Sequence, residues 1–465
     1  MSFARYPDYK DSGVEWLGEV PEHWDAVPIK YLGRLKGGAG FPHEKQGTEG
    51  AELSFHKVNA LAQADSDGFL ADSDNTIDRV TAKELGAFVF PADSIVFAKV
   101  GAALLLGRIR LLRHNSCLDN NMMGLVVRHT EFQVKFVRHA MNLVRFDLIA
   151  NPGAVPSLNE GQIGDFCLAM PPLPEQTQIA AFLDHETAKI DELVAEQRRL
   201  MALLKEKRQA VISHAVTQGL NPHAPMKPSG IEWLGDVPAH WSVIALKRIA
   251  DVQTGVAKGK DNGSRTTITV PYLRVANVQD GYLDLETIAT MEIPSEDLKR
   301  YALKPGDVLM NEGGDFDKLG RGHVWEGQID PCITQNHVFA VRPRTVSSAW
   351  LNAVTGSDFA QFYFMTRSKQ STNLASISST NLMELPVILP PEEEQHAILS
   401  FIAKQLTCFD TLTTEAQRAI DLLAERRTAL ISAAVTGQLD VRDVRGDVPP
   451  ARDSKRQSAV RSART

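Results

Sequence analysis

A long helix pattern occurs twice in this chain of 465 residues. The first copy runs from Glu175 to Leu220, and the second runs from Glu394 to Leu439, 219 residues further along. Each helix would be roughly 65 Å long, since an α-helix rises 1.5 Å per residue. Apolar residues in the first copy recur at steps of three, four and seven, the period of a coiled-coil seam. These positions are Ile179, Leu183, Ile190, Leu193, Leu200, Leu204 and Val211.

A pair of helices packed on each other is the simplest structure for this pattern. A lone helix of this kind would expose its apolar stripe to water, so the two copies are expected to bury their stripes against each other. Two ordinary core helices are the alternative. The equal length and matched spacing of the two copies favour a paired rod.

The segment that opens each half of the chain is duplicated as well. Ser12–Trp24 reads SGVEWLGEVPEHW, and Ser229–Trp241 reads SGIEWLGDVPAHW, 217 residues later. We refer to both as the tryptophan segments. A repeat of about 220 residues indicates two domains of one fold rather than a solenoid. Their aromatic side chains are expected to pack where each globular domain begins.

The residues between each tryptophan segment and its helix predict a mixed α/β (α+β) domain. Short runs with β-forming residues are separated by Gly and Asp turns; they are Ser94–Ala98, Gly124–Val127, Asp307–Met310 and His337–Val341. The two halves diverge here and keep only short correspondences. His56–Asn59 resembles Arg274–Asn277, Leu106–Arg108 matches Leu319–Arg321, and Cys117–Asn121 aligns with Cys332–Asn336.

Connectivity predicts how the helices run. Ten residues separate Leu220 from Ile231, and ten residues span at most about 35 Å. The second domain therefore starts near the far end of the first helix, and its own helix must run back. This predicts an antiparallel two-helix coiled coil with a globular domain at each end and a pseudo-two-fold repeat.

The expected domain boundaries follow from these patterns. They are a first globular domain at 1–172, a first helix at 173–220, a linker at 221–230, a second globular domain at 231–390, a second helix at 391–440 and a disordered basic tail at 441–465.

Composition limits the location and the general class of the protein. The net charge of −7 argues against a uniformly basic nucleic-acid binder, although local basic patches can coexist with an acidic total. No apolar run reaches membrane-spanning length and the N-terminus lacks a signal core, so no membrane contact is expected. The four cysteines lie far apart without a CxxC pair, at Cys117, Cys167, Cys332 and Cys408. The sequence therefore predicts a cytoplasmic protein with free thiols.

Catalytic signatures are missing from the sequence. It contains no GxGxxG, GxxxxGK[ST], HExxH or GxSxG motif, and these mark the common nucleotide, metal and nucleophile sites. His185-Glu186 is expected on a solvated helix face, and the acidic run Glu392–Glu394 is expected to favour the helix start through the macrodipole. We therefore expect no catalytic residue, no bound cofactor and no metal ligand in this chain.

Hydrogen-bonding side chains on turns are the candidates for function. Arg and Lys can bind guanine or phosphate, and Asn and Gln can bind adenine in a bidentate way. Each one alone could be a turn residue or a surface charge, but Arg and Asn recur at matched places in both halves. The candidate DNA-binding residues are Lys57, Lys99, Arg108, Asn120, Asn121, Arg274, Asn311, Lys318, Arg321, Gln335, Asn336 and His337.

Several motifs follow one another in a fixed order between Tyr6 and Asp440. They are the WLGxVPxHW segment, the Pro-Pro and Glu-Gln of the helix start, the AVTxGL-type helix end and, in the second half, GDVLMNEGGDFDKLGRG followed by CITQNHVFAVRP. In this order, and duplicated, they resemble the specificity subunit of type I restriction–modification enzymes. The run from Ala92 to Gly101 only loosely echoes its counterpart at Gly306-Asp307.

The resemblance implies a division of labour. The two globular domains would be target-recognition domains that each read one half of a bipartite, asymmetric site in double-stranded DNA. The helices would set the gap and dock two modification (methyltransferase) subunits, and restriction (motor–nuclease) subunits would join them. S-adenosylmethionine would be bound by the modification subunit.

Two other classes of function remain open from the sequence. A nuclease or methyltransferase that acts alone would need the catalytic motifs that are missing. A coiled-coil scaffold that joins two protein-binding domains without DNA would not need the basic and amide residues that recur on turns.

Overall fold

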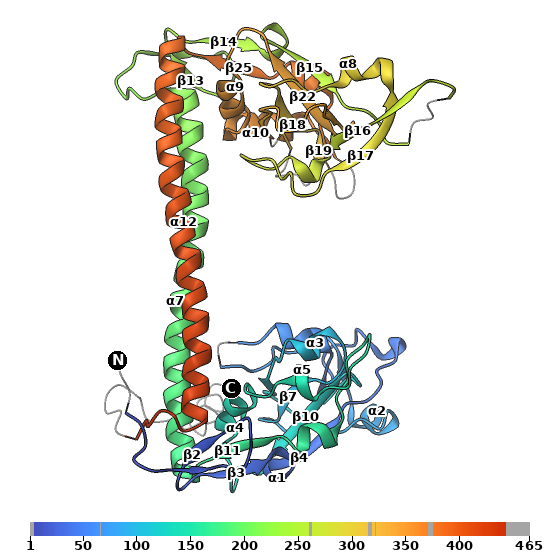
Figure 1. Ribbon diagram of the computed structural model, residues 1–465, viewed down its shortest axis with the longest axis vertical. Coiled ribbons are helices and arrows are strands. Elements are labelled where there is room, and N and C mark those ends of the chain that lie inside the picture. Colours follow the sequence, from blue (N-terminus) through green and yellow to red (C-terminus); the bar gives the residue numbers. More distant parts are fainter. Residues whose placement is uncertain are drawn as a thin grey trace, which may run out of the picture. The chain divides into compact units, whose positions relative to one another are not determined.

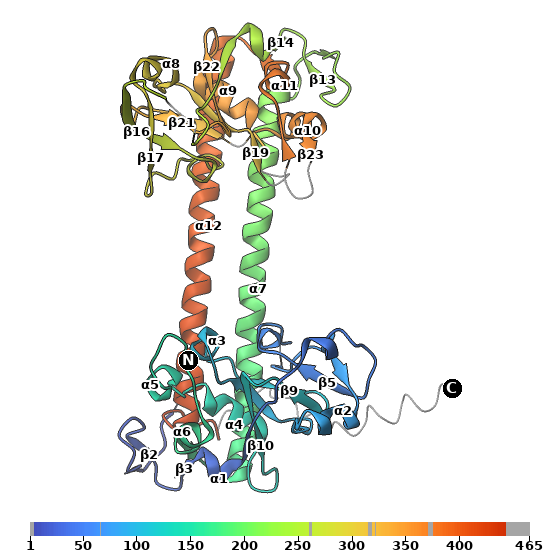
Figure 2. The same ribbon diagram turned by 90° about the vertical axis from the view of Figure 1, so that its right-hand side faces the viewer.

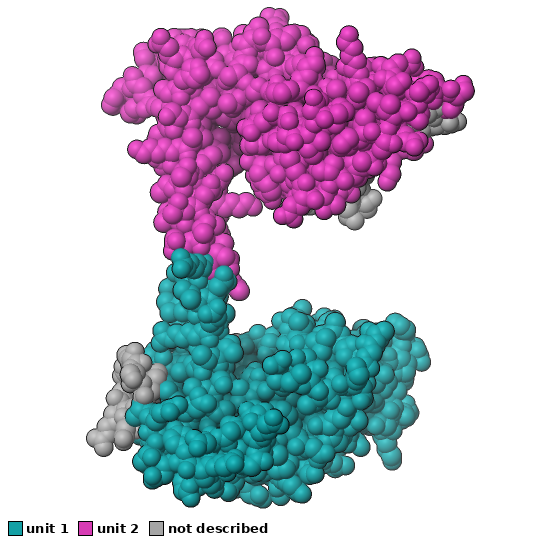
Figure 3. All heavy atoms as spheres, viewed as in Figure 1, with its two compact units in different colours: residues 1–197, 418–465 teal, residues 198–417 magenta. Residues whose placement is uncertain are grey.

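The computed structural model describes residues 4–65, 67–259, 263–314, 319–320, 322–370 and 375–442. The chain divides into two compact units, coloured in Figure 3. Unit 1 is Met1–Gln197 with Arg418–Thr465, and unit 2 is Arg198–Gln417. Each unit contains a mixed α/β globular part and a stretch of two long helices, α7 (Leu173–Gln218) and α12 (Glu392–Val435) (Figure 1). The prediction of mixed α/β content with long helices is therefore confirmed.

Short strands and helices make up the globular part of unit 1. Its strands are β1 (Tyr9–Asp11), β2 (Glu19–Pro21), β3 (Asp25–Pro28), β4 (Gly33–Gly37), β5 (Leu53–His56), β6 (Thr76–Ile77), β7 (Ile95–Ala98), β8 (Arg110–Leu111), β9 (Ser116–Leu118), β10 (Met122–Val127) and β11 (Cys167–Met170). Its helices are α1 (Ile29–Leu32), η1 (His43–Lys45), η2 (Val58–Ala62), α2 (Arg79–Glu84), α3 (Ala102–Leu105), α4 (Val134–Met141), α5 (Phe146–Ile149) and α6 (Glu160–Gly164).

Unit 2 is built from a similar series. Its strands are β12 (Met226–Pro228), β13 (Asp236–Pro238), β14 (Ser242–Ala245), β15 (Ala250–Thr254), β16 (Thr267–Leu273), β17 (Ala289–Pro294), β18 (Val308–Asn311), β19 (Gly313–Gly314), β20 (Gly322–Val324), β21 (Ile333–Thr334), β22 (Val338–Pro343), β23 (Lys369–Gln370), β24 (Ala375–Ser376) and β25 (Pro386–Leu389). Its helices are η3 (Leu246–Arg248), η4 (Val275–Asn277), η5 (Ser295–Asp297), α8 (Leu298–Tyr301), α9 (Ser348–Thr355), α10 (Asp358–Arg367) and α11 (Ser379–Met383).

The two units have the same main sheets. In unit 1 an antiparallel sheet has the order β4-β10-β7-β8, and a smaller sheet has the order β6-β5-β9 with β5 and β9 parallel. In unit 2 the orders are β15-β22-β18-β20 and β17-β16-β21, again with the last pair parallel. The four predicted strand runs coincide with β7, β10, β18 and β22 to within a few residues. Figure 2 labels β5 and β9 of the smaller sheet and β10 of the larger sheet in unit 1.

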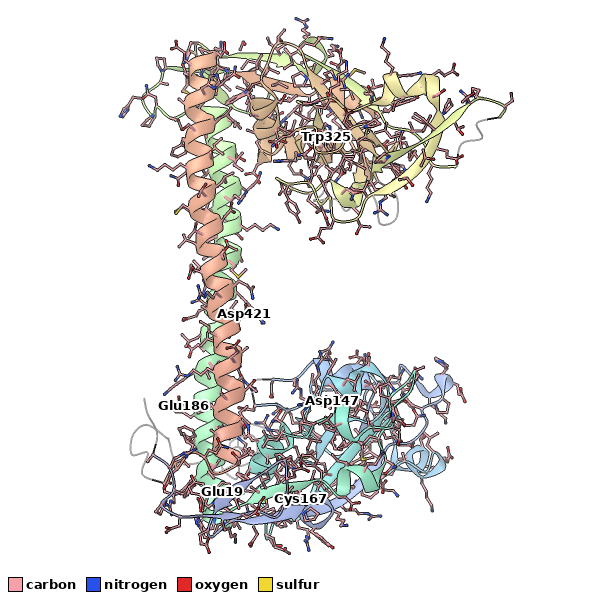
Figure 4. All side chains as sticks on the ribbon, viewed as in Figure 1. Glu19, Asp147, Cys167, Glu186, Trp325 and Asp421 are labelled. Atoms are coloured by element: carbon pink, nitrogen blue, oxygen red, sulfur yellow. The ribbon has the colours of Figure 1, made fainter. Side chains whose placement is uncertain are left out.

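Buried aromatic side chains fill the core of each unit. Trp24, Phe90, Phe97 and Phe136 are at most 1% exposed in unit 1, as are Trp241, Trp325, Trp350, Phe339 and Phe364 in unit 2. Figure 4 labels Trp325 within the globular part of unit 2. At roughly 25 cal/mol per Å² of buried apolar surface, such large side chains dominate the energy of the core. The strand β7 reads Ile-Val-Phe-Ala and is buried throughout, because it is a central strand of the sheet.

Each tryptophan segment packs on the start of a long helix. In unit 1 the indole Nε1 of Trp24 donates to Glu175 over 3.2 Å, and His23 Nε2 lies 2.8 Å from the same carboxylate. A glutamate in the first turn of a helix is also favoured by the helix dipole. Trp16 is different: it is 43% exposed and stacks on Phe166 with 4.8 Å between ring centroids.

Unit 2 repeats this contact at the start of α12. Trp241 Nε1 donates to Glu394 over 2.9 Å, and His240 Nε2 lies 2.6 Å from the other oxygen of the same carboxylate. Glu394 therefore binds the tryptophan segment in addition to its position at the helix start, a role that the sequence analysis missed. The signal was present, because His-Trp occurs in both segments and glutamate occurs in both helix starts.

Two further expectations need correction. His185 and Glu186, predicted on a solvated helix face, are half-buried on α7, and Glu186 Oε1 lies 2.9 Å from Lys189 Nζ. Figure 4 labels Glu186 on this helix. Val441 and Arg442, assigned to the disordered tail, are packed: Val441 is 5% exposed, and the Arg442 guanidinium lies 4.7 Å from the ring centroid of Tyr6. The rest of the tail lies outside the described residues. Within those residues, none of the helices has the length and apolar character needed to cross a membrane.

Candidate nucleic-acid interface

In unit 1 four of the candidate residues meet at one edge of the sheets. The loop Asp119–Asn121 connects β9 to β10. Lys57 directly follows β5, the parallel partner of β9, so its backbone lies beside this loop. Lys99 directly follows β7, and its backbone N–H donates to the carbonyl of Asn121 over 2.8 Å. The strand pairing therefore brings Lys57, Lys99, Asn120 and Asn121 together.

The buried side chain of Asp119 holds this loop through hydrogen bonds to the backbone. It is 8% exposed, and its carboxylate accepts hydrogen bonds from the backbone N–H of Asn121 over 2.9 Å and of Val58 over 3.4 Å. Burial raises the pKa of Asp119, while these hydrogen bonds and the nearby Lys57 and Lys99 act in the opposite direction. A buried carboxylate bonded to backbone N–H groups holds the loop in one shape and leaves Asn120 exposed.

The same arrangement occurs in unit 2. The loop Gln335–His337 connects β21 to β22, Arg274 follows β16, and Glu312 follows β18. The backbone N–H of Glu312 donates to the carbonyl of His337 over 2.9 Å. Unit 2 therefore brings Arg274, Gln335, Asn336 and His337 together at the matching edge.

The backbone of a glycine lies very close to the backbone of each loop. A Cβ on Gly38, directly after β4, would lie 2.0 Å from the Asp119 carbonyl oxygen. A Cβ on Gly255, directly after β15, would lie 2.2 Å from the Thr334 carbonyl oxygen. Only glycine permits such a close approach of backbones. Sequence reasoning missed both residues, although each stands at the end of a matched strand.

The structure corrects the sequence alignment of the two loops. Ala39 bridges Asp119 in unit 1, and Val256 bridges Gln335 in unit 2. Asn120 therefore corresponds to Asn336, whereas the sequence comparison paired Asn121 with Asn336. The residue that follows each parallel strand is Lys57 in unit 1 and Arg274 in unit 2, whereas the sequence comparison paired His56 with Arg274.

The exposed fraction of each candidate separates surface residues from structural ones. Asn120 and His337 are exposed, whereas Lys57, Lys99, Asn121, Arg108, Arg274, Gln335 and Asn336 are half-buried. Asn311 is only 3% exposed, and its Nδ2 donates to the carbonyl of Val278 over 2.9 Å. The assignment of Asn311 to a DNA-contacting surface is therefore wrong, because its buried amide holds two segments of the domain together.

Two candidate side chains are partly engaged in the fold. The Nζ of Lys57 lies 5.8 Å from the ring centroid of Phe41 and donates to Gln46. The Nη2 of Arg274 donates to the carbonyl of Thr287 over 3.3 Å. Both remain half-buried cations at the edge that carries the loops.

The matched Leu-Gly pairs occupy equivalent turns. Gly107 has φ 57° and Gly320 has φ 69°, a region that favours glycine. A Cβ on Gly107 would meet the ring of Phe146, and one on Gly320 would meet the ring of Phe364. Arg108 follows the first turn, while Lys318 and Arg321 lie outside the described residues.

Comparisons with known proteins show what this chain is similar to. Residues 238–421, which include most of the globular part of unit 2 and the first part of α12, match the family model described as the type I restriction modification DNA specificity domain. The specificity-subunit resemblance predicted from the sequence is confirmed. The chain is 25% identical over 441 residues to the type I restriction enzyme EcoKI specificity subunit of Escherichia coli (strain K12), an alignment that covers 91% of this chain and 90% of that protein.

Other relatives agree with this class. A putative type I restriction enzyme MjaX specificity subunit from Methanocaldococcus jannaschii is 26% identical over 206 residues, which span 44% of this chain and 47% of that protein. One similar solved structure comes from work on the structural basis underlying complex assembly and conformational transition of the type I R-M system. Its TM-score is 0.65 at 17% identity, and the match covers 90% of this chain and 99% of that chain. The structural likeness shows that the fold is shared.

Proposed function

We propose that this chain is the non-catalytic DNA-recognition subunit of a type I restriction–modification complex, and that each unit reads one half of a bipartite, asymmetric site. The observation that carries the proposal is the pair of matched strand-end loops, Asp119–Asn121 and Gln335–His337. They stand at the same place in two sheets of identical order but carry different side chains. A shared framework with different polar side chains is what two different half-sites require.

The contacts within each unit support an antiparallel pair of helices. In unit 1 the start of α7 binds the first tryptophan segment through Glu175, and the end of α12 meets it where a Cβ on Gly437 would lie 2.3 Å from Pro21. In unit 2 Glu394 and Gly219 have the same relation to Trp241. We infer a coiled coil that separates two target-recognition domains related by a pseudo-two-fold axis, with the domain boundaries expected from the sequence except that Val441 and Arg442 belong to the packed part of unit 1.

Ion pairs between the helices support this pairing. Arg427 Nε lies 3.3 Å from Asp191 in unit 1, and Arg208 pairs with Asp410 in unit 2. Exposed leucines also remain on both helices, between 41% and 57% exposed, at Leu193, Leu200, Leu203, Leu412 and Leu422. The expectation that Leu193 and Leu200 are buried in the seam is therefore wrong. Apolar side chains on a helix surface suit a protein partner. We assign them to two modification subunits that would carry S-adenosylmethionine; restriction subunits would join the complex.

Binding to DNA tests the proposal directly. The chain with its modification subunits should bind one DNA sequence selectively, and the affinity should fall steeply with added salt because phosphate contacts release counterions. The purified chain alone should neither methylate nor cleave DNA. A protein-binding scaffold would show no sequence preference in the same assay, and turnover by the isolated chain would assign it a catalytic role.

The gap between the half-sites tests the function of the helices. Deleting Glu196–Arg199 from α7 and Glu415–Arg418 from α12 removes one matched four-residue segment from each helix. Each helix shortens by about 6 Å, which is close to the rise of two base pairs at roughly 3.4 Å each. The deletion also rotates the end of each helix by about 40°. The double deletion should keep both half-site sequences and narrow the gap. An active double deletion with an unchanged gap would show that the helices do not set it.

A further inference from the structure

Lys99 and Glu312 occupy equivalent positions in the two units. Lys99 directly follows β7, which pairs with β10, the strand after the loop of unit 1. Glu312 directly follows β18, which pairs with β22, the strand after the loop of unit 2. The backbone N–H of Lys99 donates to the carbonyl of Asn121, and that of Glu312 donates to the carbonyl of His337. Leu158 and Ile377 donate to the carbonyls of Lys99 and Glu312 in turn, both over 2.9 Å.

The side chains at this position have opposite charge. Lys99 is half-buried, and its Nζ passes over Gly37, where a Cβ would lie only 2.9 Å from it. The side chain of Glu312 is 27% exposed, and its Oε2 lies 3.2 Å from Nδ1 of His337. His337 is itself 57% exposed. Both residues therefore lie at the edge formed by the recognition loops: Glu312 contacts the exposed His337, and the backbone of Lys99 pairs with Asn121.

Charge at such a position selects between the edges of the bases. In the major groove guanine presents two acceptors, N7 and O6, whereas cytosine presents the N4 amino donor. An ammonium only donates hydrogen bonds, and a carboxylate only accepts them. A carboxylate also repels phosphate, so Glu312 gains nothing from general affinity for DNA and suits selection of a base.

We propose that Lys99 and Glu312 are matched specificity-determining residues, in which Lys99 donates to a guanine in one half-site and Glu312 accepts from the N4 amino group of a cytosine in the other. This inference rests on the proposed function, since it needs each unit to read one half-site. It adds Glu312 to the candidates that sequence reasoning found, because only the strand pairing shows that Glu312 stands where Lys99 stands.

Two variants that each remove one charge test the pair in the complex with modification subunits. Glu312→Gln and Lys99→Gln remove one charge each, and Glu286→Gln changes an exposed glutamate of unit 2 as the matched control. Mapping of methylated sites should show that Glu312→Gln relaxes one C·G position in one half-site, and that Lys99→Gln relaxes one C·G position in the other. Discrimination at these positions should fall by about 5- to 150-fold, while the control keeps the full site.

Base analogues then identify the atoms involved. N4-methylcytosine at the position assigned to Glu312 should weaken binding of the unchanged complex and have little effect on Glu312→Gln. The analogue 7-deazaguanine should do the same for the position assigned to Lys99. Relaxation at an A·T position, an equal analogue effect in variant and parent, or a loss that also reduces binding to random DNA would each overturn the assignment.

The outcomes separate this inference from the proposed function. If the unchanged complex binds all DNA sequences alike, the proposed function fails, and the inference fails with it. If the unchanged complex reads a bipartite site and neither variant changes the sequence that is recognised, only the assignment of Lys99 and Glu312 is wrong.

Discussion

The two units attach their globular parts to the long helices through different chemistry. In unit 1 three cationic or ionisable residues of α4 converge on Asp184 of α7: Lys135 Nζ at 2.6 Å, His139 Nε2 at 2.8 Å and Arg138 Nη2 at 3.4 Å. In unit 2 the residues that follow α9 bind a long helix at a different place, near the end of α7, and they do so through neutral hydrogen bonds. Gln209 of α7 donates to the carbonyl of Gly356 over 2.7 Å, and Ser213 accepts from the backbone N–H of Asp358 over 2.8 Å.

The buried charges of the ionic cluster should make the stability of unit 1 more sensitive to changes than that of unit 2. Burial alone would raise the pKa of Asp184, but hydrogen bonds from His139 and Lys135 outweigh it and lower the pKa to about 2. Burial also lowers the pKa of His139. Buried charge needs complete compensation, so unit 1 should be more sensitive to substitution and to acid than unit 2. In both tryptophan segments, by contrast, a His-Trp pair contacts a glutamate at the start of a long helix, although the two glutamates differ in burial.

The largest expected effect concerns the glutamates that bind the tryptophan segments. The side chain of Glu175 is 8% exposed and also accepts from Tyr6 Oη over 2.5 Å, whereas the side chain of Glu394 is 43% exposed. Glu175→Ala should cost about 3–5 kcal/mol of unfolding free energy, because buried donors lose their partner. Glu394→Ala should cost about 1–2 kcal/mol. Urea denaturation measures the loss of unfolding free energy in each variant, and hydrogen exchange assigns the loss to one unit. Equal losses in the two variants would contradict the role of the difference in burial.

The ionic cluster gives the next effect. Asp184→Asn removes the charge that balances Lys135 and Arg138, and should cost about 2–3 kcal/mol because the site is partly open to water. Gln209→Ala, which removes one of the neutral hydrogen bonds of unit 2, should cost about 1 kcal/mol or less. Hydrogen exchange should place the first loss in unit 1 and the second in unit 2. A larger loss for Gln209→Ala would mean that the ionic cluster does not anchor unit 1.

Acid should weaken unit 1 before unit 2. Among the described residues the two buried histidines, His56 and His139, both lie in unit 1. Burial lowers the pKa of His56 from 6.5 to about 4, so the unfolded state binds the proton more readily and stability falls as pH drops from 6.5 towards 4. Asp184 stays ionised across this range.

The loss from His56 should be about 2 kcal/mol between pH 7 and pH 5. Hydrogen exchange in unit 1 at the two pH values measures it. The matched residue in unit 2 is Leu273, which like His56 ends the strand parallel to the loop strand. His56→Leu should therefore remove most of this pH dependence, and an unchanged pH dependence in that variant would exclude His56 as its cause.

Local patterns predicted the regular elements, and long-range packing decided the rest. Heptad spacing predicted α7 and α12, and β-forming runs predicted the central strands, because both patterns depend on neighbours in the chain. The cluster on Asp184 joins α4 to α7 over a distance that no periodicity encodes. Asn311 looked available as a turn amide, yet the strand pairing buries it. The loops were aligned one residue out of register, because only strand pairing fixes their correspondence.

Paired substitution of the matched loop asparagines tests the central claim most directly. Asn120→Ala and Asn336→Ala change equivalent positions in the two units, in the complex with modification subunits. If each unit reads one half-site, mapping of methylated sites should show that each variant relaxes a different half, by about 1–3 kcal/mol of discrimination at one position, while the other half stays intact. Relaxation of the same half by both variants, or equal loss on cognate and random DNA, would contradict independent reading by the two units.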